Sequence, residues 1–386
     1  MTITRIFTAT AQAAMAPLQL DFLPPEHLTS RPASWWQNVL GVVSFGKPLL
    51  LAGAQVPIAA NMIAPLRSAD DLCEVWRVAG RPVRLSNGAA GQSRVHYRYC
   101  EDLLFGSVAL DERLFGPDAA AHGGGDDAGT DAGALSSATE MAYQEIFAVL
   151  RRTGHRHLIR IWNYLPEINR EAGGEERYRL FNSARQLAFR QSGQATVGTV
   201  PAACALGSPA GSPISIYFLA ARQPPKMIEN PRQTSAYHYP PKFGRHSPTF
   251  SRACILNASA GTSLFVSGTA SIVGHETIHR GDVDAQTRET MANINALLDE
   301  ANRVVGPARY SLDGLKFKVY VRRPSDLGAI EGILSGSLRP STPIVYLQAD
   351  VCREDLLVEI EATGEPGTGA DGVMQFARHA AERPLK

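Results

Sequence analysis

Residues 213–220 read PISIYFLA, and residues 343–350 read PIVYLQAD. Both segments open with Pro-Ile and continue with β-branched and aromatic residues, a pattern that predicts strands. A second matching pair lies earlier in each half, because RIWNYLPEIN (160–169) and KVYVRRPSDL (318–327) each end a predicted strand at a proline that precedes a helix. The recurrence of these elements in the same order predicts an internal duplication.

Helices are expected between these strands in both halves. The first half offers amphipathic segments at residues 140–152 and 175–191. In the second half, residues at helical spacing that fit one buried face are Val283, Thr287, Met291, Ile294 and Leu298. They predict a long helix with Asp282 and Asp284 as acidic residues at its N-terminus. Helices on one face of a mostly antiparallel sheet, repeated twice, give an α+β architecture.

The boundary between the two repeats is expected near residue 220. Residues 1–220 would form the N-terminal repeat and residues 221–386 the C-terminal, catalytic repeat. Within the first repeat, residues 117–137 read PDAAAHGGGDDAGTDAGALSS, and so small and polar a segment lacks the apolar surface to hold one conformation. This segment is predicted to be a mobile surface insertion.

Composition points to a small-molecule partner. The chain has 386 residues, 44% of them hydrophobic and 19% charged, and its net charge of +1 offers no electrostatic reason to bind nucleic acid or a membrane surface. Five scattered cysteines without a C-x-x-C pair disfavour a disulfide framework and a zinc ribbon, and fit a reducing cytoplasm. Lys47 and Pro48 interrupt the most apolar stretch, so neither a signal peptide nor a spanning helix is expected. Fused repeats are also compatible with a monomer.

The pentapeptide HETIH, His275–His279, has the spelling of a zinc hydrolase. That chemistry needs a helix, which places both imidazoles on one face beside the glutamate. Here Gly274 and Gly281 leave room for fewer than two helical turns, and Ala285 stands where the extended motif has its third histidine. The motif is therefore expected to be a polar connection that leads into the long helix, without metal.

Several longer strings resemble known proteins. The second half is similar to the Rid (YjgF-type) fold in VSGTASIVG (266–274), GDVDAQTRETMANINALL (281–298) and VEIEA (358–362). The chain as a whole resembles the chorismatase family, whose members carry two Rid-like halves, and the further strings that carry this likeness are RIWNYLPEIN, ERYRLFNSARQLAF (176–189) and IENPRQTSAYHYP (228–240). The likeness runs from about Pro48 onward, apart from residues 117–137.

One departure from the Rid pattern bears on function. Ordinary Rid deaminases carry an arginine on the strand that here reads PIVYLQAD, and this chain has Ile344 and Val345 at that place. Enamine or imine deamination is therefore disfavoured, although it remains an alternative. A metabolite-binding module without catalysis is the other alternative.

The chorismatase resemblance implies chorismate as substrate, cleaved to pyruvate and a six-membered-ring acid without metal or organic cofactor. Protonation of the enol ether requires a carboxylic acid that burial keeps neutral, and the family's acid matches Glu359. By strand alternation Glu359 faces away from Val358 and Ile360. The sequence alone leaves open whether that face is an exposed edge or a buried site, and the resemblance favours the buried site.

Cys352 matches a cysteine of the hydroxybenzoate-forming branch of the family, where it faces the ring of the substrate. The resemblance thus favours 3-hydroxybenzoate and pyruvate as products, with hydrolysis to a dihydroxy-cyclohexadiene carboxylate as the alternative. Most unpaired cysteines are merely small buried hydrophobes, and that reading stays open.

Two substrate carboxylates call for arginines, whose planar donors bind a carboxylate bidentately. Tyrosines near them would donate hydroxyl groups or form walls around the ring. The residues we favour for substrate binding are Arg232, Arg245, Arg322, Tyr217, Tyr237 and Tyr239.

Overall fold

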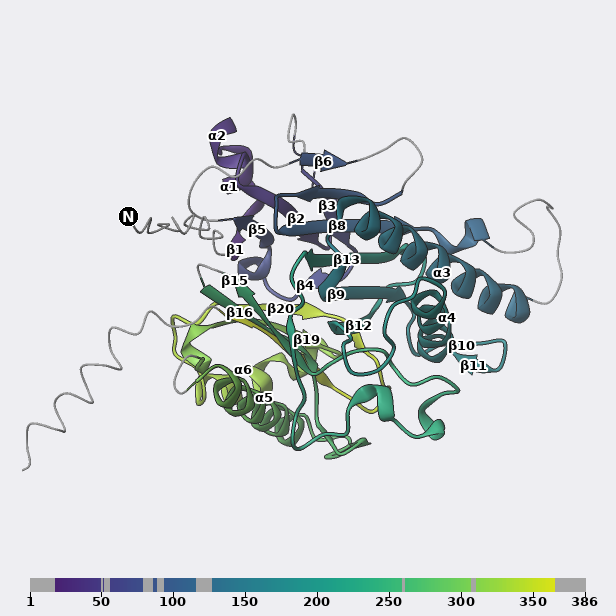
Figure 1. Cartoon of the computed structure of the whole chain (residues 1–386). Helices are drawn as coiled ribbons and strands as arrows, with labels where there is room; N and C mark the ends of the chain where they lie inside the picture. Colours follow the sequence, from purple (N-terminus) through teal and green to yellow (C-terminus); the bar gives the residue numbers. More distant parts are fainter. Residues whose placement is uncertain are drawn as a thin grey trace, which may run out of the picture.

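The computed structural model describes residues 18–49, 51, 56–78, 86–88, 94–115, 127–258, 261–306 and 310–364. Two large sheets lie face to face, and each carries its helices on its outer side (Figure 1). Helices α3 (Asp127–Thr153) and α4 (Arg177–Gln191) pack on one sheet, and α5 (Val283–Val305) and α6 (Leu327–Ser335) pack on the other. The α+β architecture of two helix-covered sheets is as the sequence predicted.

The first seven-stranded sheet is built mainly by the first half of the chain. Its strands, in spatial order, are β21 (Asp350–Val351), β12 (Ala202–Ser208), β9 (His157–Pro166), β13 (Ile214–Ala221), β8 (Leu103–Leu110), β7 (His96–Tyr99) and β6 (Ser86–Gly88). The pair β12–β9 is parallel and the other pairs are antiparallel. The two strands predicted for this half, β9 and β13, are confirmed, and the structure shows that they are direct neighbours.

The second seven-stranded sheet repeats this plan with the second half. Its strands, in spatial order, are β14 (Lys226–Ile228), β15 (Ala253–Ala258), β16 (Gly261–Thr269), β22 (Val358–Gly364), β19 (Leu315–Val321), β20 (Ile344–Gln348) and β4 (Ala64–Pro65). Here β19–β20 is the parallel pair. Each half thus lends a two-residue edge strand to the other sheet, β21 in one direction and β4 in the other, which the sequence did not predict.

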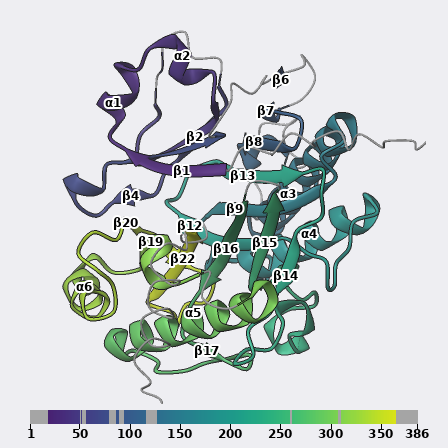
Figure 2. The ribbon, with the colours of Figure 1, turned by 60° about the vertical axis from the view of Figure 1, so that its left-hand side comes forward.

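A third sheet of four strands was also not predicted. Its order is β1 (Leu18–Leu23), β5 (Cys73–Val78), β2 (Val39–Phe45) and β3 (Ile58–Asn61). Together with the short helices α1 (Pro25–Thr29) and α2 (Ala33–Trp36), it lies on the side of the molecule away from α5 (Figure 2). Trp76 of β5 packs against Trp162 of β9, with ring centroids 5.6 Å apart, so this sheet closes one end of the core between the two large sheets.

Helix α3 corrects the expected extent of the low-complexity insertion. The helix begins at Asp127, so the second part of residues 117–137 is helical, and residues 116–126 lie outside the described residues. A buried arginine explains the difference, because Arg177 donates to Asp131 within that helix at 2.8 Å and to Glu112 at 2.6 Å. The composition of residues 117–137 could not reveal this contact between Asp131 and a distant arginine.

Two expectations for the second half had different outcomes. Helix α5 begins as predicted, and Asp282 caps it by accepting a hydrogen bond from the backbone N–H of Ala285 at 2.9 Å. The sequence of residues 228–239 (IENPRQTSAYHY) also predicts a strand, and this prediction is wrong except at its first residue, because β14 ends at Ile228. Pro231 and Pro240 lack the N–H that a sheet ladder needs, which accounts for the irregular path. No helix among the described residues is long and apolar enough to cross a membrane.

Candidate active site

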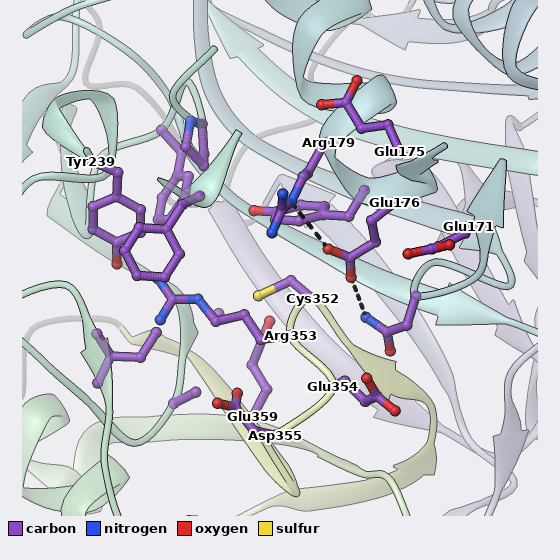
Figure 3. A pocket seen from close by; sticks show the side chains of 18 of the residues that line it. Glu171, Glu175, Glu176, Arg179, Tyr239, Cys352, Arg353, Glu354, Asp355 and Glu359 are labelled. Carbon is purple, nitrogen blue, oxygen red and sulfur yellow. Dashed lines mark hydrogen bonds and ion pairs between the residues drawn. The ribbon is translucent and has the colours of Figure 1, made fainter. Parts of the chain in front are cut away.

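A cavity of about 800 Å³ is lined by residues of both halves (Figure 3). The first half contributes residues 169–179, which connect β9 to α4 and begin that helix. The second half contributes the segment before β15, residues of β16, and the loop between β21 and β22. Glu359 and Cys352, which the sequence singled out separately, line the same cavity.

Glu359 lies on β22 with its carboxyl group turned away from the helices. Its neighbours Val358 and Ile360 belong to the core beneath α5, whereas Glu359 faces the cavity and is 3% exposed. Burial raises the pKa of Glu359 to about 8, the Glu361 carboxylate adds to the rise, and Arg160 and Arg252 oppose it. The buried alternative is thus confirmed over the exposed edge, and the group is a neutral carboxylic acid at pH 7.

Gly268 of β16 makes room for that carboxyl group. The strand is irregular between Val266 and Thr269, and a Cβ atom built on Gly268 would lie 1.9 Å from Oε1 of Glu359. The carboxyl group therefore packs against bare backbone. Gly268 was not among the residues predicted from the sequence, although a glycine inside a strand often marks a close approach of another group.

Cys352 follows β21 and projects into the cavity on the same side as Glu359 (Figure 3). Its side chain packs against an apolar cluster that contains Ile272 and Leu356. Burial raises the pKa of the Cys352 thiol to about 12, and the nearby Glu359 adds to the rise. The residue is a neutral thiol, a poor nucleophile with an apolar character.

Two arginines that the sequence analysis did not select line the cavity. Arg252 is buried and donates to Tyr239 Oη at 2.7 Å and to the carbonyl of Thr234 at 2.8 Å. Arg353 lies with its guanidinium carbon 4.1 Å from the centroid of the Phe243 ring. Nε of Arg252 and Nη2 of Arg353 have no hydrogen-bond partner in the described part of the chain. Both of these nitrogens are buried, so it is the position of the two side chains in the cavity lining that makes them candidates for ligand binding.

The part of the cavity lining that comes from the first half is rich in glutamates. Glu176 accepts a hydrogen bond from Asn169 at 3.0 Å and forms an ion pair with Arg179 at 3.5 Å (Figure 3). Burial raises the pKa of Glu176. The second half adds arginines and aromatic rings together with carboxylates, so the cavity carries charges of both signs.

Of the arginines and tyrosines that the sequence favoured, the structure brings Tyr239 to the cavity lining and leaves the others outside it. Arg232 pairs with Glu289 at 2.5 Å on the flank of α5, and Arg245 is exposed. Tyr217 is buried between the sheets, stacked on Trp162 with centroids 4.4 Å apart.

Arg322 and Tyr237 also lie outside the cavity lining, and Tyr237 packs on the ring of His238 with centroids 4.7 Å apart. Arg322 donates to Asp350 at 2.7 Å and to the carbonyls of Val351 and Arg353, both at 2.9 Å. It therefore fixes the loop that carries Cys352 without reaching the cavity itself.

HETIH is not helical; it contains β18 (Glu276–Thr277), which pairs with β17 (Ile272–Val273) in a short hairpin. His275 contacts Glu276 at 3.1 Å, whereas His279 turns toward Glu289 of α5 at 3.6 Å. Among the described residues no group of three or more histidines, cysteines or carboxylates has the arrangement of a metal site.

Comparisons with known proteins agree on one family. The model of the N-terminal part of FkbO/Hyg5-like chorismatases matches residues 74–220. A 3-hydroxybenzoate synthase of Streptomyces hygroscopicus is 42% identical over 238 residues, which is 59% of this chain and 69% of that protein. A chorismatase of the same organism is 35% identical over 309 residues, or 76% and 80% of the two chains. The crystal structure of a chorismatase superposes with a TM-score of 0.75 at 31% identity, covering 91% of this chain and 99% of that one.

Proposed function

The chain belongs to the chorismatase family, and on this premise we propose that it cleaves chorismate to pyruvate and 3-hydroxybenzoate in the cavity lined by Glu359 and Cys352. The observation that carries the proposal is the buried, neutral carboxyl group of Glu359. The relative named 3-hydroxybenzoate synthase supports the choice of product.

Glu359 is the general acid of the proposed reaction. Its proton moves to the terminal methylene carbon of the enolpyruvyl group, and the double-bond electrons form the new C–H bond. The product of this step is an oxocarbenium ion next to a carboxylate that has just formed. A pKa of about 8 suits this role, because the acid is protonated at working pH and still donates its proton readily.

The remaining steps consume no water. The oxygen of the ring hydroxyl beside the ether bonds to the ring carbon that carries the ether, the C–O bond of the ether breaks, and its electrons leave with pyruvate. This forms an epoxide, and the hydroxyl proton restores Glu359. The epoxide bond to the carbon that first carried the hydroxyl then breaks, the carbon that keeps the oxygen loses its proton so that the ring becomes aromatic, and the oxygen takes up a proton as the phenol. The atoms of chorismate therefore equal those of the two products. Addition of water to the cation would give the dihydroxy-cyclohexadiene acid in place of hydroxybenzoate.

Cys352 favours the anhydrous route by occupying space beside the ring. Its neutral thiol belongs to an apolar cluster and lies near the acid, where a water molecule would otherwise have access to the cation. The side chain acts by volume and apolarity in this proposal, and it forms no covalent bond with the substrate.

Arg252 and Arg353 are the proposed partners of the two substrate carboxylates. Their support is the position of both guanidinium side chains in the cavity lining, beside the aromatic rings of Tyr239 and Phe243. Arg232 and Arg245 were chosen from the sequence. The side chain of Arg232 pairs with Glu289 of α5, and that of Arg245 is exposed. We therefore assign the contacts with the substrate carboxylates to Arg252 and Arg353. Arg322 would contribute indirectly, through the loop that it holds.

The test is incubation of the purified protein with chorismate, followed by chromatography of the products and an enzymatic assay of pyruvate. We expect equimolar pyruvate and 3-hydroxybenzoate. Pyruvate together with a non-aromatic diene diol would replace the product assignment, and absence of pyruvate would overturn the proposed activity.

A further inference from the structure

Four charged side chains are buried between the sheets, next to the cavity but outside its lining. We call Glu361, Lys318, Arg160 and Glu74 the inter-sheet charge cluster, and each of them is at most 4% exposed. Lys318 Nζ lies 2.6 Å from Oε1 of Glu361, and Arg160 Nη2 lies 2.5 Å from its Oε2. Lys318 also pairs with Glu74.

The cluster joins all three larger sheets of the fold. Glu361 and Lys318 lie opposite each other on β22 and β19, Arg160 comes from β9 of the facing sheet, and Glu74 comes from β5 of the third sheet. Buried charges are costly unless each has partners. Their retention at one place calls for an explanation beyond packing.

Glu361 is held in its ionised form. Besides the two cations, its carboxylate accepts a hydrogen bond from Nε1 of Trp162 at 2.8 Å. Burial alone would raise the pKa of Glu361, but Lys318 and Arg160 outweigh burial and hold the pKa below its usual value. A permanent negative charge therefore stands on β22 between the sheets.

That charge lies beside the acid of the reaction. Glu361 and Glu359 are two residues apart on one strand, so their side chains share a face, roughly 7 Å apart along the strand. The titratable or charged groups that face Glu359 from the surrounding elements are Glu361, Tyr320, Arg252, Arg160, Cys204 and Cys352. Glu361 is the carboxylate in this set. It raises the pKa of Glu359, whereas the two arginines lower it.

We propose that Glu361 is a positioning residue for the reaction: its fixed charge, held by Lys318 and Arg160, keeps the neighbouring Glu359 protonated and able to donate. The role rests on the proposed function, because it matters only if Glu359 is the acid. Without the charge of Glu361, burial would still favour the neutral form of Glu359, but nothing would add to burial against Arg160 and Arg252, and Glu359 would lose its proton at a lower pH.

The test compares two single variants. E361Q removes the charge beside Glu359, and E74Q removes the carboxylate at the far end of the cluster. Lys318 keeps one carboxylate partner in each variant, Glu74 in E361Q and Glu361 in E74Q. Glu74 is outside the set of charges that shift the pKa of Glu359, so E74Q is the matched control.

The readout is the pH dependence of kcat/KM for pyruvate release. Activity needs protonated Glu359 and is lost as pH rises through its pKa. We expect the alkaline limb of the pH profile to move to lower pH by about one unit or more in E361Q, the size typical of a nearby charge, and to stay in place in E74Q. An unmoved limb in the first variant, or equal shifts in both, would overturn the proposal.

Infrared titration keeps this test separate from the proposed activity. The C=O band of a neutral carboxylic acid, assigned by its loss in E359Q, reports Glu359 without substrate. If the parent makes no pyruvate, the midpoint of this band still has to shift in E361Q. If that variant does not fold, the titration is carried out on the parent protein. The carboxyl band of Glu361 is then assigned by its change in E361D, a variant that keeps the negative charge. Protonation of Glu361 within the pH range in which Glu359 titrates would refute a fixed charge on Glu361.

Discussion

Gly268 and Glu359 occupy adjacent strands so closely that a single added carbon atom would collide with the acid. A Cβ atom on Gly268 would lie 1.9 Å from Oε1 and 2.7 Å from Cδ of Glu359, and 2.9 Å from Cβ of Cys204. The irregular register of β16 at this point brings the backbone, and not a side chain, against the carboxyl group. The position of the proposed proton donor therefore depends on the absence of a side chain at residue 268.

Substitution of Gly268 by Ala should displace the carboxyl group of Glu359 and lower kcat, because a shift of about 1 Å at a reacting group can cost on the order of 10²-fold. The measurement is steady-state pyruvate release. Gly328→Ala on α6 is the matched control, since a Cβ there meets no atom within 4 Å. Parental kcat in Gly268→Ala would show that Glu359 has room to relocate without loss.

Replacement of Glu359 by Gln should abolish the protonation step. The amide keeps the shape of the side chain but has no proton to transfer, so pyruvate release should fall by roughly 10² to 10⁴-fold, as for other losses of a general acid. Glu354→Gln, at an exposed position of the same cavity mouth, is the control and should retain activity. Full activity in Glu359→Gln would mean that another group supplies the proton.

The pH dependence should report the same group. Since burial raises the pKa of Glu359 to about 8, kcat/KM should be level near neutrality and fall as pH rises through about 8. Activity falls with rising pH because Glu359 acts as the proton donor: its protonated form can donate a proton and its ionised form cannot. A fall in kcat/KM with its midpoint near pH 4.5, the ordinary pKa of a glutamic acid, would contradict the assignment of a buried acid.

Arg353 provides the test of substrate binding. Arg353→Ala should weaken capture of a carboxylate by about 2 to 5 kcal/mol if the pair is desolvated, seen as a lower kcat/KM with a raised KM. Arg245→Ala, at an exposed arginine outside the cavity lining, is the comparison. A loss in Arg245→Ala with none in Arg353→Ala would restore the assignment that the sequence suggested.

The differences between sequence expectation and structure have a common physical origin. Strand alternation around Glu359 and the cap at Asp282 are local features, and both could be predicted from neighbouring residues. Which arginines bind the substrate could not be predicted in this way, because the residue type does not show whether a guanidinium group is already paired with a carboxylate of the protein. Arg232 meets Glu289, which is distant in the sequence, whereas Arg252 reaches the cavity. Likewise, nothing near β4 or β21 indicates that each would complete the other half's sheet.

Cys352→Ala should separate cleavage from product identity. Glu359 is unchanged in this variant, so pyruvate should still form at a rate near that of the parent. The smaller side chain leaves space beside the ring, which lets water reach the cation. We therefore expect less 3-hydroxybenzoate and a non-aromatic diene diol in its place, measured by chromatography against total pyruvate.

The matched control is Cys352→Val, which restores apolar volume without a thiol. If Cys352 acts by excluding water, Cys352→Val should recover hydroxybenzoate while Cys352→Ala does not, because the thiol is neutral and packs among apolar side chains. Diene diol from both variants would instead assign the role to the sulfur itself. Unchanged hydroxybenzoate from both would reduce Cys352 to a packing residue and leave control of the product to other side chains around the ring.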